Sequence, residues 1–206
     1  MKKLLFSTLL ILALSPAFAQ KYVFYLHGAI VEGNCEHPVK PGFGEYKYKD
    51  IVAALKAEKF EVVSECRPGG TEVKQYAGKV VKQVEDLLKK GVKPSAITVV
   101  GASKGARIAM YVSTFLKNPK LNFVFLSNCT DGGEDDVHFY GNVLSIYEKS
   151  DDIAQSCSSY KAHSTTTDMP KYKEVALNTG RKHGYIFTPM PEWMKPVTKW
   201  ANGQYD

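Results

Sequence analysis

Hydrophobic positions along the chain follow two alternating patterns. The first consists of short, nearly continuous apolar runs that end at or beside a turn-forming residue, which is typical of strands buried on both faces of a sheet. Six segments show it: residues 21–28, 60–68, 96–102, 121–128, 142–150 and 173–180. These runs predict six strands spread over most of the chain.

In the second pattern, between the runs, apolar residues recur every three or four positions, as on one face of an amphipathic helix. It is strongest over residues 71–90, with Thr71 as a candidate N-cap and Gly91 as a stop. Other helices are predicted over residues 48–59, after Ser103 as far as 118, and from about Pro191 onward. Strands alternating with helices predict a doubly wound α/β domain, whose mainly parallel sheet is covered on both faces.

The first 19 residues predict a secretory signal peptide. Two lysines precede an apolar run over residues 4–14, and Ala-Phe-Ala follows as a cleavage site before Gln20. The run is too short to span the core of a bilayer comfortably. We therefore expect an exported chain, periplasmic or secreted, with no membrane anchor after cleavage and a single domain over residues 20–206.

Charge and cysteine content narrow the function further. Loss of the two leader lysines lowers the formal charge from +6 to +4, and the remaining basic residues are scattered among acidic ones, so we expect no nucleic-acid partner. Four cysteines in an exported chain predict two disulfides, with three pairings open. None has Cys-x-x-Cys spacing, which gives redox or zinc chemistry little support.

The segment "GASKG", Gly101 to Gly105, carries the strongest candidate for chemistry. Ser103 lies between the two glycines, after a predicted strand and before a predicted helix. A tight turn at this point needs glycine, because a side chain would clash with the neighbouring backbone. Such a turn directs the serine hydroxyl out of the sheet and is typical of a nucleophile.

A serine hydroxyl needs a base, and the base needs a partner that orients it. His183 follows the last predicted strand, and Asp151 follows the strand before it, so both lie at the same edge of the sheet as Ser103. Asp152 is the alternative acid, although Asp151 is favoured because it comes first after the strand. His27 is expected to support a neighbouring turn through hydrogen bonds.

Other polar residues are interpreted as structural or solvated. Lys104 is expected to contribute only its backbone amide to the site of Ser103, and its side chain is expected to be incidental. His37, His138 and His163 have no partners at metal-ligand spacing and are predicted to lie at the surface. The acidic segment 131–136 is predicted to be a solvated loop rather than a calcium site.

Four segments, "YLHGA", "VGASKGA", "YEKSDD" and "RKHG", occur in this order, each at the end of a predicted strand. In these segments the chain resembles the α/β-hydrolase family, over nearly all of residues 20–206. That family usually has two further strands before the strand that ends in His-Gly. The resemblance therefore implies a shortened member with a six-stranded sheet in the order 2-1-3-4-5-6.

The resemblance also implies roles for individual residues. Ser103 corresponds to the nucleophile, His183 to the base and Asp151 to the acid, and the amides of Ala29 and Lys104 correspond to the oxyanion hole. The implied reaction is the cleavage of a carboxylic ester in two steps through an acyl-enzyme. It requires no metal and no organic cofactor.

The length and polarity of one loop bear on the class of substrate. The segment 128–142 is too short and polar for a large lid, which favours a small or otherwise accessible acyl ester. Thioesters, amides and acyl transfer to another alcohol use the same triad and stay open, as does a catalytically silent binding module on the same scaffold. The sequence indicates no oligomeric state, so a monomer is the default expectation.

The strand order implied by the resemblance selects among the disulfide pairings. The first and second strands are neighbours, and Cys35 and Cys66 follow them. The fourth and fifth strands are also neighbours, and Cys129 and Cys157 follow those. We therefore expect Cys35 to pair with Cys66 and Cys129 with Cys157.

Overall fold

The computed structural model describes residues 20–130 and 136–206. The predicted signal peptide therefore lies outside the described residues. The central sheet has six parallel strands in the order β4-β1-β5-β6-β7-β8, which is the predicted order 2-1-3-4-5-6. The strands are β1 (Tyr22–Leu26), β4 (Glu61–Val63), β5 (Ile97–Ala102), β6 (Asn122–Leu126), β7 (Asn142–Glu148) and β8 (Tyr172–Leu177).

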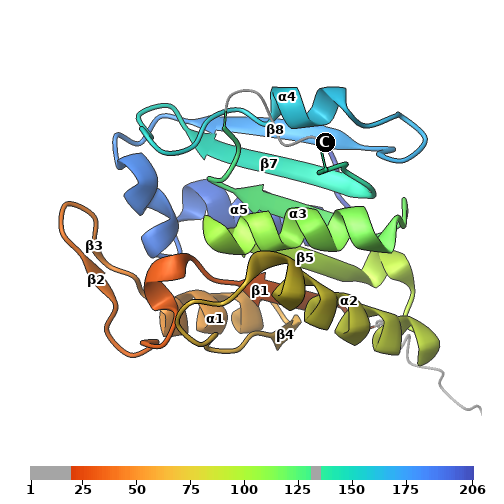
Figure 1. Ribbon diagram of the computed structural model, residues 1–206, viewed down its shortest axis with the longest axis horizontal. Coiled ribbons are helices and arrows are strands. Elements are labelled where there is room, and N and C mark those ends of the chain that lie inside the picture. The colour runs from red at the N-terminus through yellow and green to blue at the C-terminus, as the bar shows by residue number, and fades with distance from the viewer. Residues whose placement is uncertain (1–19, 131–135) are drawn as a thin grey trace, which may run out of the picture.

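Helices cover both faces of this sheet, as predicted for a doubly wound domain (Figure 1). The helices are α1 (Tyr48–Ala57), α2 (Val73–Lys89), α3 (Lys104–Leu116), α4 (Ser158–Ala162) and α5 (Pro191–Ala201). Residues of α2 and α3 pack in one apolar cluster, and residues of α1 and α5 pack in a second cluster on the opposite face. The α/β fold class expected from the sequence is confirmed.

The middle strand β5 shows why the strands have continuous apolar sequences. All six of its residues are buried, and neighbouring positions face opposite clusters. Val99 packs with the residues of α2 and α3, whereas Val100 packs with those of α1 and α5. A strand covered on both faces favours apolar side chains at neighbouring positions, and Thr98 is the one polar residue of β5.

Several local predictions need correction. The second strand is shorter than predicted, since only Glu61–Val63 pairs in the sheet. Thr71 does not cap α2: Glu72 occupies the N-cap position, and the Thr71 hydroxyl donates instead to the Pro68 carbonyl at 2.7 Å. The glycine- and proline-rich loop after β1 contains an unpredicted hairpin, formed by β2 (Val39–Lys40) and β3 (Gly44–Glu45).

Both disulfides have the pairing expected from neighbouring strands. Cys35 is bonded to Cys66 and Cys129 to Cys157, with Cα–Cα distances of 5.9 and 5.0 Å. These bonds tie loops together at the carboxyl ends of β1 and β4 and of β6 and β7.

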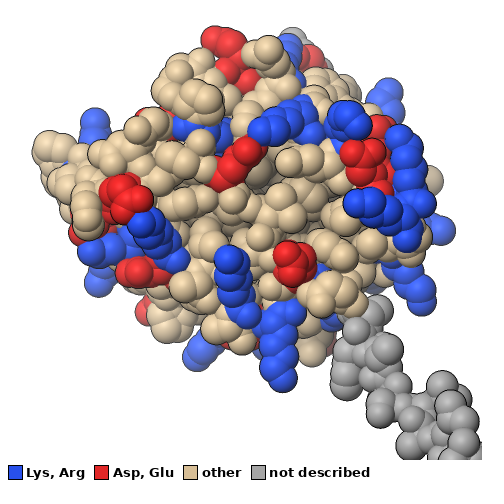
Figure 2. Space-filling model, turned by 90° about the horizontal axis from the view of Figure 1, so that it is seen from below, with Lys and Arg blue, Asp and Glu red and all other residues tan. Residues whose placement is uncertain are grey.

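Surface charge and hydropathy add two observations. Figure 2 shows basic and acidic side chains intermingled on one face of the molecule. Within residues 20–130 and 136–206, no helix has the length and apolar character needed to cross a membrane.

All six strands run in one direction, so their carboxyl ends meet at one edge of the sheet. Ser103 follows β5, Asp151 follows β7 and His183 follows β8, in the short 3-10 helix η3 (Lys182–Phe187). Ligands and catalytic groups of open α/β sheets lie at this edge.

Candidate active site

Ser103 occupies a turn that only glycine neighbours permit. It has φ = +52°, a left-handed conformation that is uncommon for a residue with a side chain. A Cβ atom on Gly101 would lie 2.2 Å from the Gly105 carbonyl oxygen, and one on Gly105 would lie 1.9 Å from the Leu26 carbonyl oxygen. The two glycines therefore allow α3 to start close against β1 and β5, with Ser103 at the point where strand becomes helix.

The three residues singled out from the sequence form a connected chain of side chains. His183 Nε2 lies 3.0 Å from Ser103 Oγ, and His183 Nδ1 lies 2.8 Å from Asp151 Oδ2. With its proton on Nδ1, the imidazole donates to the carboxylate and accepts from the serine hydroxyl. This is the connectivity of a nucleophile, its base and an orienting acid.

The Asp151 carboxylate is buried and well supplied with donors. It accepts hydrogen bonds from the Ser127 hydroxyl and from the Ile153 amide, the latter at 2.9 Å, in addition to the bond from His183. Burial by itself raises the pKa of Asp151, but these hydrogen bonds outweigh it and hold the pKa below its usual value. Asp152 is different: it is exposed and pairs with Lys182 at 2.9 Å. Asp151 is therefore the carboxylate that faces the imidazole.

Glu148 is a further buried acid at this edge, which the sequence analysis did not single out. Its carboxylate accepts the amide and hydroxyl of Thr179 at 2.8 and 2.7 Å, and the amide and hydroxyl of Ser150 at 3.3 and 3.1 Å. The Ser150 hydroxyl in turn accepts the Lys182 amide at 3.2 Å. Burial raises the pKa of Glu148, but the hydrogen bonds outweigh it and lower the pKa. Glu148 thus links the loop that carries Asp151 to the loop that carries His183.

The two residues whose amides are expected to form an oxyanion hole each begin a helical segment at this edge of the sheet. Lys104 is the first residue of α3, and Ala29 is the first residue of the 3-10 helix η1 (Ala29–Val31). Amides in the first turn of a helix have no partner within that helix. The loop before Ala29 lies close to the serine, since a Cβ on Gly28 would be 3.6 Å from the Ser103 Cβ.

His27 supports this loop through hydrogen bonds, as predicted. Its ring is fully buried: Nδ1 lies 2.9 Å from the Gly28 carbonyl oxygen, and Nε2 accepts the Arg67 amide at 3.1 Å. Burial, together with the nearby Arg67 guanidinium, lowers the pKa of His27 to about 4. The ring is therefore neutral at pH 7.

The expectation of an incidental Lys104 side chain is wrong. Its ammonium pairs with the buried Glu32 carboxylate at 2.8 Å, and Glu32 also lies 3.4 Å from Arg67 Nε. Arg67 donates to the His27 carbonyl as well. The side chain of Lys104 thus joins the start of α3 to the network beneath the loop of Ala29.

The remaining histidines are exposed, as predicted. His37 pairs with Glu45 at 2.9 Å, and the rings of His138 and His163 lie with centroids 6.3 Å apart, tilted by 51° relative to each other. Within the part of the chain that the structure describes, no group of three or more potential ligands is arranged to hold a metal ion. Residues 131–135, most of the acidic loop considered for calcium, lie outside the described residues.

A pocket of about 370 Å³ opens beside the serine and the histidine. Its lining is mainly apolar: Gly28, Ala29, Ile30, Lys40, Phe43, Tyr46, Ser103, Ile153, His183, Ile186 and Phe187. The unpredicted hairpin supplies one wall, since the Phe43 ring lies 6.3 Å from the His183 ring and 5.8 Å from the Phe187 ring. The sequence does not predict this wall, because β2 and β3 have only two residues each and show no alternation of apolar and polar positions.

Comparison with known proteins identifies the fold of the chain. No family model and no curated protein matches the chain. Solved structures do, among them an esterase from Pyrococcus furiosus, with 14% identity, a TM-score of 0.62 and coverage of 92% of this chain and 85% of that one. The chain has the α/β-hydrolase fold.

Two further structures are similar over comparable lengths. A phospholipase/carboxylesterase from Dyadobacter fermentans has 16% identity and a TM-score of 0.57, covering 90% of this chain and 91% of that one. A serine hydrolase without a lid from Xanthomonas campestris has 13% identity and a TM-score of 0.53, covering 93% and 85%. The α/β-hydrolase resemblance noted in the sequence is confirmed at the level of the fold.

Proposed function

We propose that this protein is an exported serine hydrolase that cleaves a carboxylic ester through Ser103, His183 and Asp151. The observation that carries the proposal is the unbroken chain of contacts from Ser103 Oγ to His183 Nε2 and from His183 Nδ1 to Asp151, at 3.0 and 2.8 Å. Esterases and a carboxylesterase among the structural neighbours support hydrolysis as the reaction class.

In the proposed reaction, Ser103 Oγ attacks the ester carbonyl while His183 Nε2 takes the hydroxyl proton. Asp151 holds the imidazole through Nδ1 and stabilises the imidazolium, and its low pKa keeps the carboxylate ionised. The imidazolium then protonates the departing alcohol. Water, activated by the same base, attacks the acyl-enzyme and releases the carboxylic acid.

The amides of Ala29 and Lys104 are the proposed oxyanion hole. Each donor of this kind contributes about 3 kcal/mol to the stability of the transition state. The positive φ angle of Ser103 supports a catalytic role for this serine, because unusual backbone conformations are concentrated at active sites.

The pocket beside Ser103 favours a compact acyl group. Its volume of about 370 Å³ lies near the lower end of the usual range for small-molecule sites. Phe43, Ile153 and Phe187 offer apolar contacts to a short alkyl chain, whereas a long lipid tail exceeds this space. We therefore propose short-chain or otherwise compact acyl esters as substrates.

Export is the second part of the proposal. Two disulfides are typical of proteins that fold in an oxidising compartment, and they fit a chain that leaves the cytoplasm. Peptide mapping of the protein isolated from culture supernatant or periplasm tests this part of the proposal. The expected result is an N-terminus at Gln20. Recovery of the chain from the cytoplasm with its leader intact contradicts export.

Hydrolysis of p-nitrophenyl butyrate by the purified mature chain tests the proposed activity. Ser103→Ala and His183→Ala should each lower kcat by about three orders of magnitude or more, and the double variant should lose little more, because members of a triad act as a unit. Ser158→Ala, at an exposed serine, is the matched control and should keep full activity. Wild-type rates in Ser103→Ala exclude the proposed nucleophile.

A further inference from the structure

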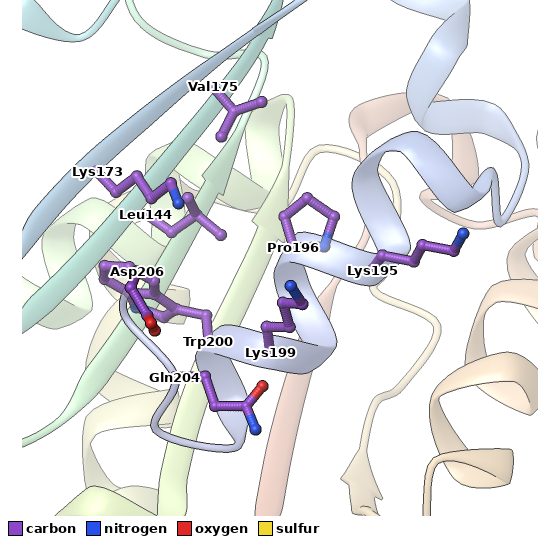
Figure 3. Close-up of a pocket in the computed structure, with 9 residues that line it drawn as sticks. All are labelled: Leu144, Lys173, Val175, Lys195, Pro196, Lys199, Trp200, Gln204 and Asp206. Carbon is purple, nitrogen blue, oxygen red and sulfur yellow. The ribbon is translucent and has the colours of Figure 1, made fainter.

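A second cavity lies away from the proposed active site, between α5 and the edge strand β8 (Figure 3). Its volume is about 240 Å³, and its lining residues are Leu144, Lys173, Val175, Lys195, Pro196, Lys199, Trp200, Gln204 and Asp206. It shares no lining residue with the pocket beside Ser103. The cavity exists because α5 packs over β5, β6 and β7 and leaves this face of β8 partly uncovered.

The floor of the cavity is apolar and held in place. Leu144 and Trp200 are almost fully buried, and Val175 and Pro196 line the space between strand and helix. The Trp200 indole donates to the Asn142 carbonyl at 3.1 Å and packs edge-on against the Tyr205 ring. Because the hydrogen bond fixes the indole, an apolar ligand meets a preformed surface.

The rim of the cavity is basic. Lys173, Lys195 and Lys199 line it, and within the described part of the chain none of them forms an ion pair. Many other surface lysines do, such as Lys74 with Asp136 at 2.6 Å. Figure 3 shows the Lys173 side chain extending from the strand toward the helix, whereas Lys195 points away from the strands.

We propose that this cavity binds a small amphiphilic carboxylate, with its alkyl part on Trp200 and Leu144 and its carboxylate between Lys173 and Lys199. A cavity of about 240 Å³ is smaller than most small-molecule sites, so a short alkyl chain fits it better than a long one, and hexanoate serves as a probe of this kind. Lysine ammonium groups act as point charges and favour an anion without demanding a planar fork. Asp206 is the one acidic side chain of the lining, so the three lysines leave the lining with a net positive charge that favours an anion.

Titration of the ¹⁵N-labelled protein with hexanoate tests the site directly. The chain has two tryptophans, so the indole N–H signal of Trp200 reports on this cavity and that of Trp193 serves as an internal reference. Hexanoate should move the Trp200 signal in a saturable manner, and 1-hexanol, which lacks the charge, should bind at least about tenfold more weakly. The Ala29 amide reports independently on the pocket beside Ser103.

Charge-removing variants complete the test. Lys173→Gln combined with Lys199→Gln should weaken hexanoate binding about tenfold, while Lys56→Gln, an exposed lysine on α1, should leave it unchanged. The double variant should keep its p-nitrophenyl butyrate hydrolysis, so the outcome is independent of the proposed ester cleavage. An unmoved Trp200 signal, equal binding of 1-hexanol, or a shift confined to Ala29 overturns the proposal.

Discussion

Acidification should destabilise the fold through His27, in a pH range set by the burial of its ring. The neutral ring satisfies both of its contacts, since Nδ1 lies 2.9 Å from the Gly28 carbonyl oxygen and Nε2 accepts the Arg67 amide at 3.1 Å. A proton on Nε2 removes that acceptor and places a second positive charge beside the Arg67 guanidinium. Burial is the larger cause and Arg67 the next, and together they lower the pKa from 6.5 to about 4.

The size and sign of the effect follow from this difference in pKa. The unfolded chain binds the proton more tightly than the folded one, so stability from His27 is complete above pH 6.5 and is lost as the pH falls toward 4. A difference of about 2.5 pKa units corresponds to about 3 kcal/mol of unfolding free energy once both forms are protonated.

Urea unfolding of the wild type and of His27→Gln at a series of pH values measures this contribution. Other titrating groups are common to both proteins, so the difference in unfolding free energy isolates His27. That difference should change by about 2.5 kcal/mol between pH 7.5 and about pH 4.5, with the wild type losing more. Parallel pH profiles for the two proteins refute the reasoning, as does an NMR titration of His27 in the folded state with a midpoint near 6.5.

Three further predictions, each tested by substitution, concern other parts of the structure. Asp151→Asn should lower esterase kcat by several orders of magnitude and Asp152→Asn by less than twofold, because only the first carboxylate contacts the imidazole; the reverse order moves the acid one residue along. Gly105→Ala should lower the free energy of unfolding in urea by about 3 kcal/mol or more, because the added Cβ clashes with backbone atoms. The control Gly78→Ala, in helix α2, has open space around its Cβ and should raise the free energy of unfolding by about 0.5–1 kcal/mol. Phe43→Ala should widen the pocket beside Ser103 and so raise the ratio of kcat/KM for a hexanoate ester to kcat/KM for a butyrate ester. An unchanged ratio excludes Phe43 as a wall of this pocket.

The parts of the fold that the sequence predicts are those governed by local pattern. The strands are recognisable because both faces are buried, as Val99 and Val100 show. The turn at Ser103 is recognisable because the clashes that exclude side chains at Gly101 and Gly105 come from backbone, which any sequence provides. Such constraints act within a few residues and leave a direct trace in the amino-acid sequence.

Contacts between distant segments leave no such trace. The ion pair of Lys104 joins residues 72 positions apart, and the hydrogen bonds from Thr179 to Glu148 join residues 31 positions apart. The residues next to Glu148 in the sequence do not distinguish this buried glutamate from an acidic residue at the solvated surface. The wall formed by Phe43 likewise depends on how a short hairpin folds back over η3, which alternation of apolar residues does not encode.

Reaction with a fluorophosphonate, followed by peptide mass spectrometry, tests the central claim most directly. The reagent bonds covalently to a serine that its own base activates, so the contact between Ser103 and His183 predicts a single adduct on the peptide that contains Ser103. The same treatment should leave Ser103→Ala and His183→Ala unmodified. An unlabelled wild-type protein, or an adduct on another serine that persists in Ser103→Ala, contradicts the proposed nucleophile.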